Sequence, residues 1–133
     1  MLLVIADPAA PYIQQLTFPP DVPFILTEDV EKLKTAAPQA DAILYASFKP
    51  HLLQTVLPLA TKARWIHSLW TGVDWILFRE LLAHPAQLTN GRGAFRWPLA
   101  EWTMGAMLFF AFDLRRVIRQ QEQGIWQPFV GST

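Results

Sequence analysis

The sequence contains no cysteine, and its 11 basic and 11 acidic residues cancel to a formal net charge of zero. The absence of cysteine excludes a disulfide framework, thiolate chemistry and cysteine-ligated metal. The balanced charge gives no electrostatic footprint for a nucleic acid. The three histidines, His51, His67 and His84, lack the spacing of a metal site. We therefore expect no metal, no nucleic-acid partner and structural or exposed roles for these histidines.

The chain also lacks a segment typical of membrane insertion or secretion. The N-terminus, Met1–Asp7, has no basic region and becomes polar after six residues, as a buried strand does. No charge occurs from Trp102 to Phe112, but this apolar run is shorter than the about 20 residues that span a bilayer. We expect a cytoplasmic protein with no membrane partner.

What the chain has in quantity is apolar side chains. Of its 133 residues, 52% are hydrophobic, and they include six Trp and nine Phe. This length suffices for one domain with a modest core. So many large aromatic side chains indicate more apolar surface than one small domain buries by itself.

Short apolar runs alternate with helical patterns along the first 90 residues. Strands are predicted at 2–6, 22–26 (with Pro23 making it an edge or late-starting strand), 40–46, 65–69 and 87–89. Helices are predicted at 12–16, 28–37 (capped by Thr27), 50–60 and 75–83 (capped by Asp74). This alternation predicts an α/β fold, a parallel sheet of flavodoxin-like type with flanking helices.

A different element follows. Pro98 suits the first position of a helix, and Gly124 is expected to end it. Arg115, Arg116 and Arg119 would then lie near the C-terminus of that helix, where cations favour the helix dipole. The run from 102 to 112 is apolar on all sides, so we expect it to be buried on all sides, one of them by a second body. A core helix of a monomer is the alternative.

Two glycine-containing turns follow predicted strands. Thr71-Gly72-Val73-Asp74 follows the fourth strand, where ligands bind in open α/β sheets, and Gly72 would let consecutive N–H groups form a nest for a carboxylate. A plain turn is the competing interpretation. Asn90-Gly91-Arg92-Gly93 does not match a dinucleotide turn, because Arg96 stands where the third glycine belongs.

The order from Ala63 to Trp126, with these two turns and then Pro98-Leu-Ala-Glu-Trp102, resembles the N-terminal half of the D-isomer-specific 2-hydroxyacid dehydrogenases (glyoxylate/hydroxypyruvate reductase-like). Enzymes of that family interconvert 2-oxo acids and D-2-hydroxy acids with NAD(H) or NADP(H). The resemblance implies that residues 1–96 form an incomplete catalytic domain on the substrate side. It also implies that 97–126 form a long interdomain and dimerisation helix, and 127–133 a tail.

By position, the resemblance implies a small 2-oxo or 2-hydroxy carboxylate as ligand. Its contacts would be the backbone amides of Thr71, Gly72 and Val73, with Tyr45, Ala46 and Ser47 as the pocket wall. It implies a homodimer whose interface includes Trp102, Met104, Phe109, Phe110 and Phe112.

The family's catalytic His, its orienting Arg and its G-x-G-x-x-G dinucleotide-binding (Rossmann) domain lie in a later half that has no counterpart in these 133 residues. We therefore expect no catalytic residue and no bound cofactor in this chain. Two hypotheses stay open. The first is a truncated, inactive portion of an NAD(P)-dependent oxidoreductase. The second is a non-catalytic oligomerisation or carboxylate-binding module that reuses the fold.

Overall fold

The computed structural model describes residues 1–130 and divides the chain into two compact units, Met1–Arg92 and a second unit from Gly93 onward. Residues 131–133, the end of the predicted tail, lie outside the described residues. Each unit is described by itself below. The assignment of these parts to a substrate side and an interdomain helix stays a prediction.

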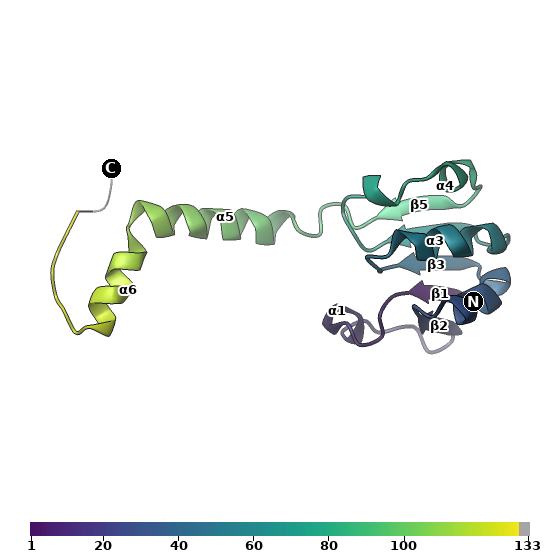
Figure 1. Ribbon diagram of the computed structural model, residues 1–133, viewed down its shortest axis with the longest axis horizontal. Helices are drawn as coiled ribbons and strands as arrows, with labels where there is room; N and C mark the ends of the chain where they lie inside the picture. The colour runs from purple at the N-terminus through teal and green to yellow at the C-terminus, as the bar shows by residue number, and fades with distance from the viewer. Residues whose placement is uncertain (131–133) are drawn as a thin grey trace. The chain divides into compact units, whose positions relative to one another are not determined.

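The first unit is built on a five-stranded parallel sheet (Figure 1). Its strands are β1 (Leu2–Ile5), β2 (Phe24–Thr27), β3 (Ala42–Tyr45), β4 (Trp65–Ser68) and β5 (Gln87–Asn90). They lie in the order β2-β1-β3-β4-β5, so β2 and β5 are the edges. The predicted α/β class and parallel sheet are confirmed, including an edge position and a late start, after Pro23, for the second strand.

Helices cover the two faces of the sheet unequally. One face packs against α2 (Val30–Ala36), α3 (Pro50–Val56) and α4 (Arg79–Ala83) through a core that includes Ile43 and Ile66. On the other face, Val4, Ala6 and Ala46 pack against Ile13 of the short helix α1 (Pro11–Gln14). Burial of continuous apolar strands on one side thus gives most of the stability of this unit.

Several predicted helix boundaries are wrong for local reasons. Thr27 ends β2 and does not cap α2; the cap is Asp29, whose carboxylate accepts from the Lys32 N–H at 2.9 Å. The third helix ends at Val56 and continues as a 3₁₀ turn, Leu57–Leu59, because Pro58 lacks the N–H that an α-helix needs.

The predicted helix over 75–83 is also divided. A 3₁₀ turn, Asp74–Ile76, precedes extended residues at Leu77 and Phe78, and only then does α4 begin. Asp74 therefore opens a 3₁₀ turn, and its side chain makes no capping hydrogen bond, contrary to the prediction.

The second unit contains two helices where the sequence predicted one. Helix α5 (Arg96–Ala111) begins two residues before Pro98, and α6 (Leu114–Glu122) follows. Between them Asp113 has φ 47°, a left-handed conformation that a short polar side chain tolerates but that breaks a right-handed helix. The single long helix is thus a wrong prediction.

The break at Asp113 changes where the three clustered arginines lie within a helix. Arg115 and Arg116 lie in the first turn of α6 and only Arg119 in its last, so the predicted dipole contact holds for Arg119 alone. Gly124, with φ 64°, ends α6 as predicted: its N–H and that of Ile125 donate to the Gln121 and Gln120 carbonyls. Among residues 1–130, no helix has the length and apolarity needed to cross a membrane.

Candidate functional site

The carboxyl ends of β3 and β4 bring two of the predicted site segments together. Tyr45 pairs with Ser68 in the parallel ladder, and the Leu69 N–H donates to the Tyr45 carbonyl at 2.9 Å. The Trp70 indole N–H then donates to the Ser47 carbonyl at 3.1 Å. The segment 45–47 therefore lies directly beside the turn that contains Thr71, Gly72 and Val73.

The carbonyl groups of this turn are occupied, whereas its N–H groups are not. The Thr71 carbonyl accepts from the Asn90 side-chain amide, and the Gly72 carbonyl accepts from the Trp75 indole at 3.0 Å. Within the described part of the chain, no protein group accepts a hydrogen bond from the N–H of Thr71, Gly72 or Val73. Three consecutive backbone donors thus stay available to an anion at the ligand-binding end of the sheet.

The predicted reason for glycine at position 72 is wrong. Gly72 does not have a positive φ, so the turn lacks the alternation of right- and left-handed residues that forms an anion-binding nest. A Cβ atom at position 72 would also meet no atom within 4 Å. Gly72 and Thr71 are both exposed. The free N–H groups result from the open loop after β4 and from the side chains that hold its carbonyls.

Glycine is needed at position 91 instead, which the sequence analysis did not single out. A Cβ atom on Gly91 would lie 2.5 Å from the Leu69 carbonyl oxygen. The Gly91 N–H donates to the Trp70 carbonyl at 3.3 Å, and the Thr71 hydroxyl donates to the Gly91 carbonyl at 3.1 Å. This close approach joins the turns after β4 and β5 and fixes the backbone that carries the free donors.

The three residues predicted as a pocket wall have different roles. Ala46 is buried, and its carbonyl accepts from the Tyr12 hydroxyl at 3.1 Å. Ser47 is buried and donates its hydroxyl to the Glu28 carboxylate, which also binds the Lys49 ammonium. The Ser47 hydroxyl hydrogen is therefore engaged by Glu28, and this contact links the segments that follow β2 and β3.

Tyr45 is fully buried, and its hydroxyl has no hydrogen-bond partner among the residues that the structure describes. Burial, with a smaller contribution from the Glu28 charge, raises the pKa of Tyr45 to about 12. Its ring lies 6.0 Å from that of Trp75. Tyr45 is therefore a buried, neutral phenol that packs near Trp75 beside the site.

An aromatic layer covers the same edge. The rings of Phe48 and Trp70 stack with centroids 4.2 Å apart, and Trp75 lies 6.4 Å from Phe48. The side chain of Phe48 is 67% exposed. Phe48, Trp70 and Trp75 were not predicted as site residues, although Phe48 and Trp70 closely follow the ends of predicted strands, which is the signal that could have found them.

The histidines and the turn after β5 were also considered above as candidates for a metal and a dinucleotide. No group of three His, Asp or Glu side chains in residues 1–130 is arranged to hold a metal ion. The His67 ring nitrogen Nδ1 lies 2.8 Å from the Thr89 hydroxyl, and the His84 Nδ1 accepts from the Ala86 N–H. Arg96 opens α5 where a dinucleotide turn would need its third glycine, so the turn after β5 is not a G-x-G-x-x-G turn.

The predicted interface residues lie on α5 or at its end. None of the α5 residues, all of which the structure describes, is buried within the chain. Trp102 is 75% and Phe110 70% exposed; Met104 and Phe112 are also exposed, and Phe109 is half-buried. Most of the apolar side chains of α5 are therefore exposed, with Phe109 partly covered.

The fold is similar to that of a known enzyme class. A solved structure of a D-isomer specific 2-hydroxyacid dehydrogenase family protein from Aeromonas salmonicida subsp. salmonicida matches 98% of this chain with a TM-score of 0.66 and 24% sequence identity. The chain spans 42% of the length of that structure. The sequence matches no protein-family model and no curated protein. The likeness therefore establishes the fold alone, and it agrees with the predicted α/β class and parallel sheet.

Proposed function

We propose that this chain provides the substrate side of an NAD(P)-dependent D-2-hydroxyacid dehydrogenase, and that it binds the carboxylate of a small 2-oxo or 2-hydroxy acid. The observation that carries the proposal is the set of three free N–H groups at Thr71, Gly72 and Val73, at the carboxyl end of β4 in this fold. Backbone donors suit a carboxylate, because hydrogen bonds to a charged acceptor are stronger than those to a neutral one.

The residues described here bind and position, and we assign none of them a catalytic role. Trp75 and Asn90 hold the turn by its carbonyls, which restricts the backbone that carries the three donors. In a dehydrogenase of this class the nicotinamide cofactor supplies or takes the hydride, and no contact to it is assigned to this chain.

The direct test is an NMR titration of the whole chain with D-lactate, with the neutral lactamide as the matched control. We expect shifts of the amides of residues 71–73 with D-lactate, at a dissociation constant of about 1 mM, since a few backbone hydrogen bonds give a few kcal/mol. Lactamide should leave these amides unchanged, because it lacks the charge. Equal shifts with both compounds, or none at high concentration, would disprove carboxylate binding at this turn.

A second candidate function is a non-catalytic oligomerisation module that keeps the carboxylate site, and the exposure of α5 favours it. In both cases we propose that the chain forms a homodimer through Trp102, Met104, Phe109, Phe110 and Phe112. Aromatic side chains bury about 150–250 Å² each, so half of the area of four of them is roughly 400 Å², near the largest apolar patch of a typical monomer. Measured reduction of a 2-oxo acid by the purified chain with NADH or NADPH would contradict the module.

A further inference from the structure

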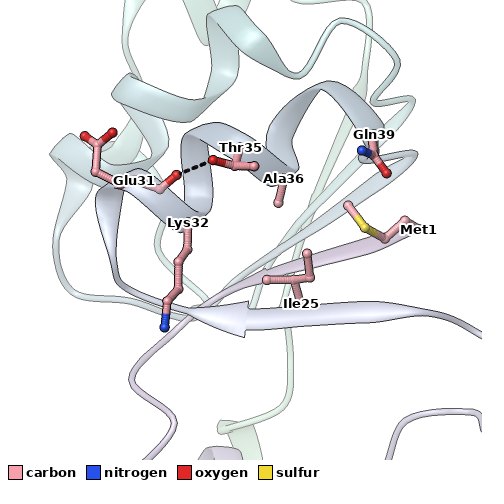
Figure 2. Close-up of a pocket in the computed structure, with 7 residues that line it drawn as sticks. All are labelled: Met1, Ile25, Glu31, Lys32, Thr35, Ala36 and Gln39. Carbon is pink, nitrogen blue, oxygen red and sulfur yellow. Dashed lines mark hydrogen bonds between the residues drawn. The ribbon is translucent and has the colours of Figure 1, made fainter.

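A surface hollow of about 420 Å³ lies far from the turn after β4, between the edge strand β2 and helix α2. Figure 2 shows α2 running across β2, with Ile25 and Ala36 in the middle of the hollow, Lys32 toward the carboxyl end of the strand, and Met1 and Gln39 toward the other end. Its volume lies within the range of roughly 300–1,000 Å³ that is usual for binding pockets.

The strand beside this hollow has an unpaired main-chain edge. The Leu2 and Ala6 N–H groups donate to the Pro23 and Thr27 carbonyls, so every second residue of β2 faces β1. The N–H and C=O groups of Phe24 and Leu26 therefore face outward. Nothing in residues 1–130 forms a hydrogen bond with them. Such an edge is a template for one more strand.

The side chains around the hollow define what this added strand would carry. Its floor, formed by Ile25 and Ala36, is apolar, and Ile25 is 37% exposed. Glu31 is already paired with Lys34 at 2.9 Å, and the Thr35 hydroxyl donates to the Glu31 carbonyl (Figure 2). Within the described chain the Lys32 ammonium has no ion pair. The hollow therefore offers a ligand an exposed apolar floor and one cation, the Lys32 ammonium.

We infer that β2 and α2 form a docking groove for an extended segment of a partner protein, which adds to the sheet as a sixth strand antiparallel to β2. Its main chain pairs with Phe24 and Leu26. An acidic side chain contacts Lys32, and the side chain two residues later, an apolar one, fills the floor at Ile25, because alternate residues of a strand share a face. The antiparallel direction follows from its slightly more stable pairing.

A second copy of this chain fits the groove less well. Antiparallel pairing of two β2 strands would place two such hollows side by side on one face of the joint sheet, and neither would fill the other. Packed interiors tolerate few such voids. The inference is also independent of the proposed function, since carboxylate binding at residues 71–73 involves none of these residues.

The test is an NMR titration of the whole chain with the capped peptide Ac-Thr-Asp-Thr-Leu-Thr-Val-NH₂. We expect shifts of the amides of residues 24, 26 and 32–36 at a dissociation constant of about 0.3 mM, typical of a short segment that must order on binding. The same peptide methylated on the amide nitrogens that face β2 should not bind, because it lacks the donors, and this control leaves the protein unchanged.

Two matched variants test the charge. Lys32→Gln should weaken peptide binding by roughly fivefold, whereas Lys62→Gln, the same change at an exposed lysine that does not line the groove, should not. Binding that survives N-methylation, an equal effect of both variants, or no shift at 3 mM peptide, about ten times the expected constant, would overturn the inference. Shifts of residues 24 and 26 that depend on protein concentration without peptide would overturn it in favour of a second copy. Shifts confined to residues 71–73 would report the carboxylate site and also overturn it.

Discussion

Gly91 lies so close to Leu69 that the two residues exclude a side chain between them: a Cβ atom on Gly91 would stand 2.5 Å from the Leu69 carbonyl oxygen. The obstacle is main chain, not the end of a flexible side chain, so it cannot move aside cheaply. Gly72, in the neighbouring turn, has open space around the corresponding position. The two glycines therefore make a matched pair for substitution.

We expect Gly91→Ala to lower the free energy of unfolding by roughly 1–3 kcal/mol, the usual cost of an overpacked site. Gly72→Ala should change it by less than about 0.5 kcal/mol, because this exposed position has neither a steric contact nor a positive φ. Urea unfolding followed by Trp fluorescence measures both. Equal stabilities of the two variants would mean that the turns after β4 and β5 are not packed as described.

Removal of the Ser47 hydroxyl should destabilise the first unit. Ser47 donates to the Glu28 carboxylate, which is only 17% exposed, and Ser47→Ala leaves this carboxylate with one donor fewer. The expected loss is about 1–3 kcal/mol, the cost of an unsatisfied, partly buried charged group. Thr55→Ala, an exposed hydroxyl that donates to the His51 carbonyl, is the control and should cost less. The same urea unfolding experiment compares them, and a Ser47→Ala variant as stable as the parent would contradict this role.

Tyr45 gives a prediction in alkaline solution. Its pKa of about 12 in the folded chain exceeds the value of about 10 expected when unfolded. The protonated Tyr45 hydroxyl therefore makes a contribution to the free energy of unfolding that is complete below about pH 10. This contribution is lost as the pH rises from about 10 toward 12, because Tyr45 loses its proton in the unfolded chain at a lower pH than in the folded chain.

Tyr45→Phe should remove this loss, and it should also raise stability near neutral pH by roughly 1 kcal/mol, since it deletes a buried hydroxyl without a partner. Unfolding curves at pH 8 and pH 11 on parent and variant give both quantities. A variant that is less stable at pH 8 would show that the hydroxyl has a partner in solution.

Self-association through α5 predicts different effects for one substitution on α5 and one on α6. Phe110→Glu places a charge on a side chain that is 70% exposed in the single chain, so it should leave the fold intact and shift the chain to monomer. Glu122→Gln on α6 removes a charge outside the predicted interface residues and should keep the oligomer. Sedimentation velocity at about 50 μM, a concentration suited to micromolar affinities, is the measurement. A parent chain that sediments as a monomer would refute the proposal.

The sequence predicted the sheet well because its signals are strong and local. The runs at Leu2 and Ile43 are apolar without interruption, as buried strands of a parallel sheet are, and the alternation of the predicted strands with helices leaves little choice of fold class. The helix boundaries failed where backbone geometry decides them. No periodicity shows that Asp113 adopts φ 47°, or that Pro58 converts the end of α3 into a 3₁₀ turn.

The site was predicted in position but not in detail. The order of strands brings residues 45–47 and 71–73 together, and this could be inferred from a parallel sheet. Which hydrogen-bonding groups remain free could not be inferred, because this depends on side chains elsewhere in the sequence. Asn90 and Trp75 donate to the carbonyls of the turn, and the Glu28 carboxylate accepts from the Ser47 hydroxyl. The glycine that the backbone requires proved to be Gly91 for the same reason.

Tyr12 has a consequence for where a ligand can enter this sheet. The chain leaves β1 toward β2 on one side and returns to β3 on the other, so the natural crevice of a doubly wound sheet lies between the ends of β1 and β3. Tyr12 crosses this gap: its hydroxyl binds the Ala46 carbonyl and its ring meets Trp70 edge-on at 5.6 Å. The protein's own aromatic side chain therefore lies across this crevice, so a ligand that entered between β1 and β3 would have to displace Tyr12.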